Sequence, residues 1–162
     1  MRTGKGRRQV MPEEKKKRGM PDGMTRLQLM QDKRSNVQSM TDLMDVELDA
    51  FDRGWARLLC YPGEKHRNPS FNVHGGYGAT VLDGVMGWAL ISTLAEEEVF
   101  TTVDLNIKYL RAMKADGTVY VAHGKVIDTQ GRTVITDGTI VDPDGRICVY
   151  GTATCRIVRP RR

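Results

Sequence analysis

The most apolar segment of the chain occupies residues 77–92. Its apolar positions are spread around nearly every direction of a helix instead of forming one stripe: Ala79, Val81, Leu82, Val85, Met86, Trp88, Ala89, Leu90 and Ile91. A helix that is apolar all round is typical of a protein interior. The pattern therefore predicts a buried central helix, in which Asp83 is the single charged residue.

Strand-like runs follow this helix at residues 101–112, 117–128, 132–141 and 146–158. Apolar and polar residues alternate within them, as at Val103, Leu105 and Ile107, which is the spacing of a half-buried strand. Segments of turn-forming residues, such as the Asp-Pro-Asp-Gly sequence at 142–145, separate the runs. One long helix followed by an antiparallel meander predicts an α+β fold.

A second helix is predicted upstream of the central one, with Thr41 as its cap. Asp42 and Asp45 lie in its first turn, where carboxylates suit the helix dipole. Apolar residues recur at steps of three and four along it: Leu43, Val46, Ala50, Phe51, Trp55 and Leu58.

The positive charge of the chain is concentrated at its N-terminus. The formal net charge is +5, but residues 1–40 carry 11 basic and 4 acidic side chains, whereas residues 41–162 carry 14 and 16. Residues 1–36 have neither sustained periodicity nor aromatic residues, so we expect them to be mostly disordered. We therefore interpret residues 1–40 as a basic extension and residues 41–162 as the domain. A solvated arm is favoured over a nucleic-acid or membrane-surface arm, because basic runs without a motif are weak signals.

Length and cysteine usage narrow the class further. A chain of 162 residues suits one domain with a substantial core. No run of eighteen or more apolar residues occurs, so we expect no membrane-spanning segment. Cys60, Cys148 and Cys155 have no metal-like spacing, and their odd number argues against a secreted disulfide framework. We expect buried or half-buried thiols in a cytoplasmic protein. His66 and His123 are isolated, and we predict no metal site.

The start of the central helix is suited to bind a ligand. His74-Gly75-Gly76 leads into it, and the first turn of a helix carries unpaired N–H groups and partial positive charge. Such a helix start stabilises an anion or a carbonyl oxygen that is gaining charge. Asp83 lies farther along the same helix, where a buried carboxylate needs a partner. From the residues alone, Asp83 is either a structural cap on a neighbouring element or a reactive group.

Asn68, His74-Gly75-Gly76 and Asp83, which follows the histidine by nine residues, resemble the signature of PaaI-like hotdog-fold acyl-CoA thioesterases. The resemblance extends in register over residues 66–158 and includes the stretches 102–111, 131–132 and 144–146. It implies a hotdog fold, in which an antiparallel sheet wraps around the central helix. The family has a strand ahead of that helix, which we expect here to be short, near residues 56–61, or lost.

The resemblance also implies an activity, the hydrolysis of an acyl-CoA or aryl-CoA thioester. Asp83 would be the nucleophile or the general base, and the sequence leaves both roles open. The backbone N–H of Gly75 would bind the oxyanion. Asn68 would orient the thioester or the water, and the Thr102 hydroxyl would hold the attacking water. No cofactor is implied, since coenzyme A is part of the substrate.

His74 is expected to have a structural role, bonded to the backbone, in preference to acting as a base. Substrate contacts are expected from four further residues: Gly76, Phe71, Lys108 and Arg111. Phe71 departs from the family, which often has glycine three residues before the histidine. A bulky ring at this position is expected to narrow the acyl pocket or to change its floor.

The family pattern also implies an assembly. In the proteins that this chain resembles, Gly75 and Asn68 of one subunit face Asp83 and Thr102 of the partner subunit. We therefore expect an obligate two-fold dimer with two shared sites, paired again into a tetramer. The alternative function is a noncatalytic acyl-CoA-binding module, which ranks second because Asp83 is present. A DNA-binding regulator is disfavoured, since residues 1–40 show no paired helices.

Overall fold

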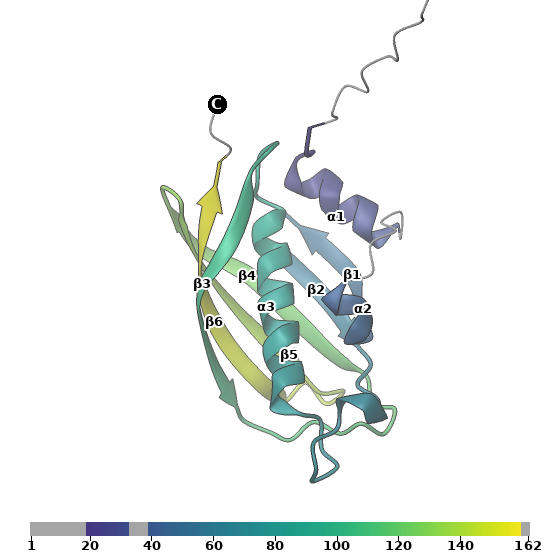
Figure 1. Cartoon of the computed structure of the whole chain (residues 1–162). Helices are drawn as coiled ribbons and strands as arrows, with labels where there is room; N and C mark the ends of the chain where they lie inside the picture. Colours follow the sequence, from purple (N-terminus) through teal and green to yellow (C-terminus); the bar gives the residue numbers. More distant parts are fainter. Residues whose placement is uncertain (1–18, 33–38, 160–162) are drawn as a thin grey trace, which may run out of the picture.

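A computed structural model describes residues 19–32 and 39–159 (Figure 1). Its main feature is one antiparallel sheet of six strands in the order β1-β2-β4-β5-β6-β3. The strands are β1 (Val46–Asp52), β2 (Trp55–Cys60), β3 (Val99–Tyr109), β4 (Tyr120–Gln130), β5 (Thr133–Val141) and β6 (Ile147–Val158). The helices are α1 (Gly23–Gln31), α2 (Met40–Leu43), the 3-10 helix η1 (Glu64–His66) and α3 (Gly75–Ile91). The central helix and the four strands after it are where the sequence predicts them.

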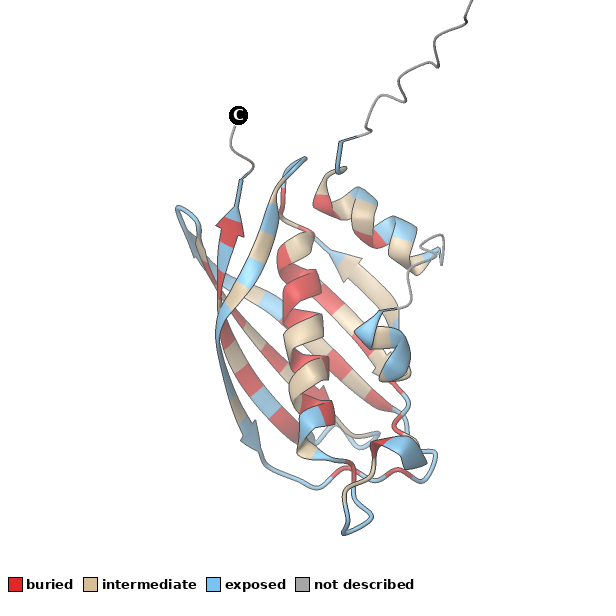
Figure 2. Cartoon of the chain, viewed as in Figure 1, coloured by how far each residue is buried: buried red, intermediate tan, exposed pale blue. Residues whose placement is uncertain are grey.

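The sheet curves around α3, which is the most buried element in Figure 2. Leu82, Val85 and Met86 are fully buried on its sheet side. Below them lies a row of glycines, in which Gly124 of β4 pairs with Gly138 of β5 and Gly138 with Gly151 of β6. A Cβ on Gly124 would lie only 2.5 Å from the carbonyl oxygen of Val85. The helix backbone therefore packs directly on the sheet at this point.

The helix predicted over residues 41–58 is wrong beyond its first turn. Only α2 is helical there, and β1 and β2 form an antiparallel hairpin around a turn at Gly54, whose φ is +78°. In β2 the buried residues alternate, at Ala56, Leu58 and Cys60. A strand near residues 56–61 is thus confirmed. β1 lies at the edge of the sheet and has a bulge near Leu48, so its apolar spacing also fits a helix.

The disorder expected for residues 1–36 does not extend to residues 23–31, which form α1. Asp22 caps this helix by accepting a hydrogen bond from the backbone N–H of Thr25 at 3.1 Å. Leu27 is fully buried, and the side chain of Gln31 donates to the carbonyl oxygen of Asp49 on β1 at 2.8 Å. The rest of the expectation, for residues 1–18 and 33–36, lies outside the described residues.

We expect Leu27→Ala to lower the free energy of unfolding by about 2–4 kcal/mol, because it removes a fully buried side chain from the contact between α1 and the domain. Leu29→Ala is the matched control, since Leu29 is exposed on the same helix. It should change stability by less than about 0.5 kcal/mol. Urea denaturation of both variants measures the difference, and equal midpoints would contradict the packing of α1.

The three thiols are free and buried, as the sequence predicts. Burial raises the pKa of the Cys60 thiol to about 12, so it is protonated at neutral pH. None of the helices in the described part of the chain is long and apolar enough to cross a bilayer.

Candidate active site

The start of α3 is built by His74 and two glycines. His74 precedes the helix, and its Nδ1 accepts a hydrogen bond from the backbone N–H of Gly76 at 2.8 Å. This bond to the backbone is the one that the structural role expected for His74 requires. The bond also occupies the Gly76 N–H, which the sequence analysis expects to contact substrate. The N–H of Gly75, at the first position of the helix, has no partner within the helix.

Asn68 shapes the loop that leads to this helix. Its Oδ1 accepts hydrogen bonds from the backbone N–H groups of Ser70 at 2.9 Å and Asn72 at 3.2 Å. Asn68 therefore stabilises this turn. Its Nδ2 group has no hydrogen-bond partner among residues 19–32 and 39–159, so this group stays free to donate to a ligand.

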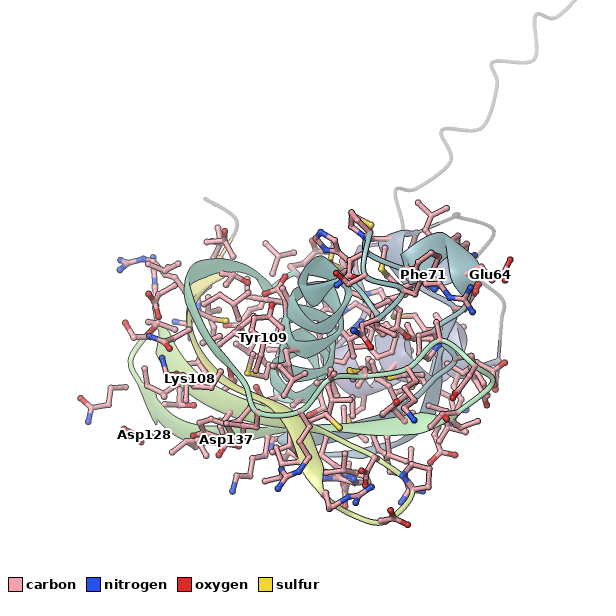
Figure 3. The ribbon with its side chains drawn as sticks, turned by 90° about the horizontal axis from the view of Figure 1, so that it is seen from below. Glu64, Phe71, Lys108, Tyr109, Asp128 and Asp137 are labelled. Carbon is pink, nitrogen blue, oxygen red and sulfur yellow. The ribbon has the colours of Figure 1, made fainter. Side chains whose placement is uncertain are left out.

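Phe71 lies in the same turn with a φ of +62°, and its side chain is 78% exposed. Figure 3 shows it on the side of Glu64, away from Tyr109. Within one subunit Phe71 does not line the cavity at the helix start, so the expectation that it narrows an acyl pocket is not met there.

We expect Phe71→Gly to stabilise the protein by about 1 kcal/mol, because a left-handed backbone strains every residue with a Cβ. The melting temperature should rise by a few degrees. Phe71→Ala is the matched control, since it removes the ring but keeps the Cβ and the strain. A rise of equal size in the alanine variant would show that loss of the exposed ring, not relief of strain, is responsible.

A cavity of about 240 Å³ lies at the start of α3. Its walls come from the loop, the helix start and the ends of β3 and β6: Asn68, Asn72, Val73, His74, Gly75, Gly78, Tyr109, Arg111, Ala112, Met113 and Val149. Four of the expected site residues are thus brought together here. Asp83, Thr102 and Lys108 are not among them.

A larger hollow, of about 900 Å³, lies between α1, α2, β1 and α3. None of the site residues expected from the sequence lines it. Two of the residues that line it, Gln31 and Ser39, lie within two positions of the segment 33–38, which the structure does not describe. We therefore place the candidate site at the smaller cavity.

Asp83 lies in the middle of α3 and is half-buried. The hydroxyl of Thr102 donates to its Oδ1 at 2.9 Å. No cation forms an ion pair with Asp83 among the described residues. A structural carboxylate in an apolar setting is usually neutralised by a cation. Asp83 instead bonds to a hydroxyl and has no cation beside it among the described residues.

Thr102 owes its position to an irregularity of β3. The register between β3 and β6 shifts between Thr102 and Asp104, and Thr102 pairs with Cys155 of β6. Bulges of this kind redirect a side chain. Burial raises the pKa of the Cys155 thiol, and the negative charge of Asp83 acts in the same direction. The hydroxyl of the neighbouring Thr101 does not bond to Asp83, so Thr102 is the threonine that contacts the carboxylate.

The two groups of site residues are separated along the helix. Gly75 and Asp83 are eight positions apart, which corresponds to about 12 Å along the axis. A nucleophile and an oxyanion donor must both reach one carbonyl group, within about 3 Å of its atoms. Within one chain, the helix start and the pair of Asp83 and Thr102 are therefore two separate candidate half-sites.

The two cationic residues expected near the substrate lie close to the end of β3. Arg111 lines the cavity, and its guanidinium donates to the carbonyl oxygen of Ile147 at 2.6 Å. Lys108 projects outward beside Tyr109 in Figure 3 and donates to the side chain of Asn106 at 2.9 Å. Neither charge is neutralised by a carboxylate among the described residues.

Tyr109 is a cavity residue that the sequence analysis does not single out. Its hydroxyl donates to the carbonyl oxygen of Gly75 at 2.7 Å. The sequence carries one signal for it, since Tyr109 belongs to the stretch 102–111 that resembles the family. The alternation of apolar and polar residues alone marks Tyr109 only as another residue of a strand.

Comparisons with known proteins concern the sequence family and the fold of this chain. Residues 72–149 match the sequence model of the thioesterase superfamily. No curated protein sequence matches the chain. The structure resembles that of a thioesterase from Haemophilus influenzae, with 18% identity, a TM-score of 0.73 and coverage of 82% of this chain and 90% of that chain.

Two further solved structures are similar. A phenylacetic acid degradation-related protein from Ralstonia eutropha has 22% identity and a TM-score of 0.72, with coverage of 80% of this chain and 97% of that chain. A Streptococcus mutans protein bound to acetyl-CoA has 21% identity and a TM-score of 0.68, with coverage of 78% and 97%.

An antiparallel sheet wrapped around one helix, shared with these structures, is the hotdog fold. Over residues 72–149 the chain resembles the thioesterase superfamily, and its resemblance to the PaaI-like members is confirmed.

Proposed function

We propose that this protein hydrolyses acyl-CoA or aryl-CoA thioesters. The observation that carries the proposal is Asp83, a half-buried carboxylate whose hydrogen-bond partner is the Thr102 hydroxyl and which no described cation neutralises. Such a carboxylate is available for attack or for proton abstraction. Thioesterases are among the structural neighbours, which supports the reaction class.

The chemistry follows from the two half-sites. The Gly75 N–H, aided by the dipole of α3, binds the thioester carbonyl oxygen as it gains negative charge. Asp83 either attacks the carbonyl carbon itself or removes a proton from the water that does. If Asp83 attacks, the C–S bond breaks to give coenzyme A thiolate and a mixed anhydride with Asp83; water then hydrolyses the anhydride, which releases the free acid, restores Asp83 and supplies a proton to the thiolate. If Asp83 is the base, water adds to the carbonyl carbon as Asp83 takes its proton, the C–S bond breaks to release the free acid, and the proton passes to the leaving thiolate. Thr102 holds Asp83 or the water in place.

The complete site needs two subunits in this proposal. Of the two edge strands, β1 is partly covered by α1, whereas β3 has an open edge with Val103 63% and Leu110 56% exposed on or next to it. Open apolar edges are usually covered by another strand. Pairing of β3 with the same strand of a second copy would form a two-fold dimer. Gly75 and Asn68 of one subunit would then meet Asp83 and Thr102 of the other.

Arg111, which lines the cavity, and Lys108, which lies outside it, give the surface near the end of β3 a positive charge. We propose that they contact the phosphates of coenzyme A, since guanidinium and ammonium groups bind phosphate strongly. The Streptococcus mutans relative is bound to acetyl-CoA, which supports this ligand class.

A panel of acyl-CoAs and aryl-CoAs tests the function, with release of the free thiol as the readout. Hydrolysis of at least one of them well above the uncatalysed rate is expected. Binding of acyl-CoA without hydrolysis would support the noncatalytic module instead. A single turnover in ¹⁸O-labelled water then tests the nucleophile role, because label in the Asp83 carboxylate requires a mixed anhydride that water cleaves at the Asp83 carbonyl.

A further inference from the structure

Tyr109 connects the edge strand to the helix start. It is the last residue of β3, and its hydroxyl donates to the carbonyl oxygen of Gly75, the first residue of α3, at 2.7 Å. The two residues are far apart in the sequence, so the bond fixes one element against another. The side chain is also 54% exposed and lines the cavity, where Figure 3 shows it beside α3.

The glycines at the helix start leave room for the Tyr109 ring. A Cβ on Gly75 would lie 3.4 Å from the ring, and a Cβ on Gly78 would lie 3.4 Å from it and 3.3 Å from Val149. The ring therefore lies directly against the first turn of the helix. A Cβ at either position would lie in van der Waals contact with the ring, so larger side chains there would have little room.

A second bond joins the same strand to the same helix. Thr102, near the start of β3, bonds to Asp83, and Tyr109, at its end, bonds to Gly75. One strand thus holds both the carboxylate and the candidate oxyanion donor. The first turn of a helix is where the backbone is least constrained by its own hydrogen bonds. A tyrosine bonded to that turn limits how far the Gly75 N–H can move.

We propose that Tyr109 is a positioning residue for the oxyanion donor, acting through its hydrogen bond to the Gly75 carbonyl. This inference rests on the proposed thioester hydrolysis. An oxyanion donor acts only when its N–H lies about 3 Å from the developing charge, so a small loss of alignment reduces turnover. The hydroxyl is expected to affect the transition state more than substrate binding, and hence kcat more than KM.

Tyr109→Phe tests this, since it removes the hydroxyl and keeps the ring against Gly75 and Gly78. We expect kcat to fall roughly tenfold, with KM and the melting temperature nearly unchanged. Tyr61→Phe is the matched control, because Tyr61 is exposed, does not line the cavity at the helix start, and donates its hydroxyl to Glu47 at 3.5 Å. Its kcat should equal that of the wild type.

The outcomes separate the inference from the proposed function. An unchanged kcat in Tyr109→Phe overturns the inference while the wild-type activity stands. A rise in KM alone, or a fall in kcat that only follows the loss of folded protein measured by circular dichroism, also overturns it. Should Tyr109→Phe fail to fold, hydrogen exchange of the Tyr77 and Gly78 amides in the wild type decides, because the Gly75 N–H has no partner within the helix and the Gly76 N–H bonds to His74. Slow exchange supports a held helix start, and exchange as fast as in an unfolded peptide overturns it. A wild type that hydrolyses no thioester refutes the proposed function instead.

Discussion

Asp83→Asn should lower kcat by at least about a hundredfold with every acyl-CoA that the wild type hydrolyses, because an amide can neither attack the carbonyl nor take a proton from water. The variant should remain folded. Its amide oxygen can still accept the hydrogen bond that Thr102 donates to Asp83, so the melting temperature should change little. Steady-state kinetics and thermal denaturation of the same preparation measure both quantities.

Asp128→Asn is the control for this substitution. Asp128 is exposed on β4, and Figure 3 shows it far from the helix start. The Asp128→Asn substitution also changes a carboxylate to an amide, but it lies outside both half-sites, so the kcat of this variant should equal that of the wild type. Comparable turnover by Asp83→Asn and the wild type would refute the role of Asp83, and the protein would then be a binding module or use another residue.

The central helix and the meander after it could be predicted because their signals are long. An apolar surface all round α3 leaves the interior as its only place, and strands β3 to β6 span 9–12 residues each. The glycines that allow α3 to approach the sheet, such as Gly124, also had to be present. The sequence alone does not show which atom of the helix each glycine contacts.

The N-terminal half was mispredicted for a physical reason. In β1, edge position and a bulge remove the regular alternation that marks a strand. β2 does alternate, but it is short, and apolar residues three and four apart across both strands occur by coincidence. α1 was missed because Leu27 is its one fully buried large side chain, too little for a periodic signal. Tertiary contacts determine the structure of both the β1–β2 hairpin and α1, and a local sequence pattern does not show such contacts.

The site was predictable as a set of residues and not as an arrangement. Asn68, Gly75 and Asp83 were found through the family resemblance, and their separation into two groups follows only from the length of α3. The Tyr109 bond joins residues that are 34 positions apart, so no local pattern indicates it. The structure adds that Oδ1 of Asn68 holds the turn, whereas its Nδ2 has no hydrogen-bond partner within the described part of the chain.

Subunit mixing should restore activity to two inactive variants. Asn68→Asp keeps the oxygen that accepts from Ser70 and Asn72 but removes the Nδ2 donor, so it should inactivate the helix-start half without breaking the turn. Asp83→Asn inactivates the other half. In a mixed dimer, one of the two shared sites combines two intact halves. With random exchange of equal amounts, about half of the dimers are mixed, so activity should reach about a quarter of the wild-type value.

The control is a mixture of Asp83→Asn with Thr102→Val. Asp83 and Thr102 belong to the same half-site, joined by the hydrogen bond between them, so no mixed dimer contains an intact site and activity should stay near the sum of the two variants. Sedimentation must first establish a dimer or a tetramer, and labelled subunits must show that exchange has occurred. A monomer with full turnover would refute both the assembly and the shared site. Exchange without recovery in the first mixture would refute the shared site alone, because each subunit would then carry Gly75 and Asp83 to its own substrate.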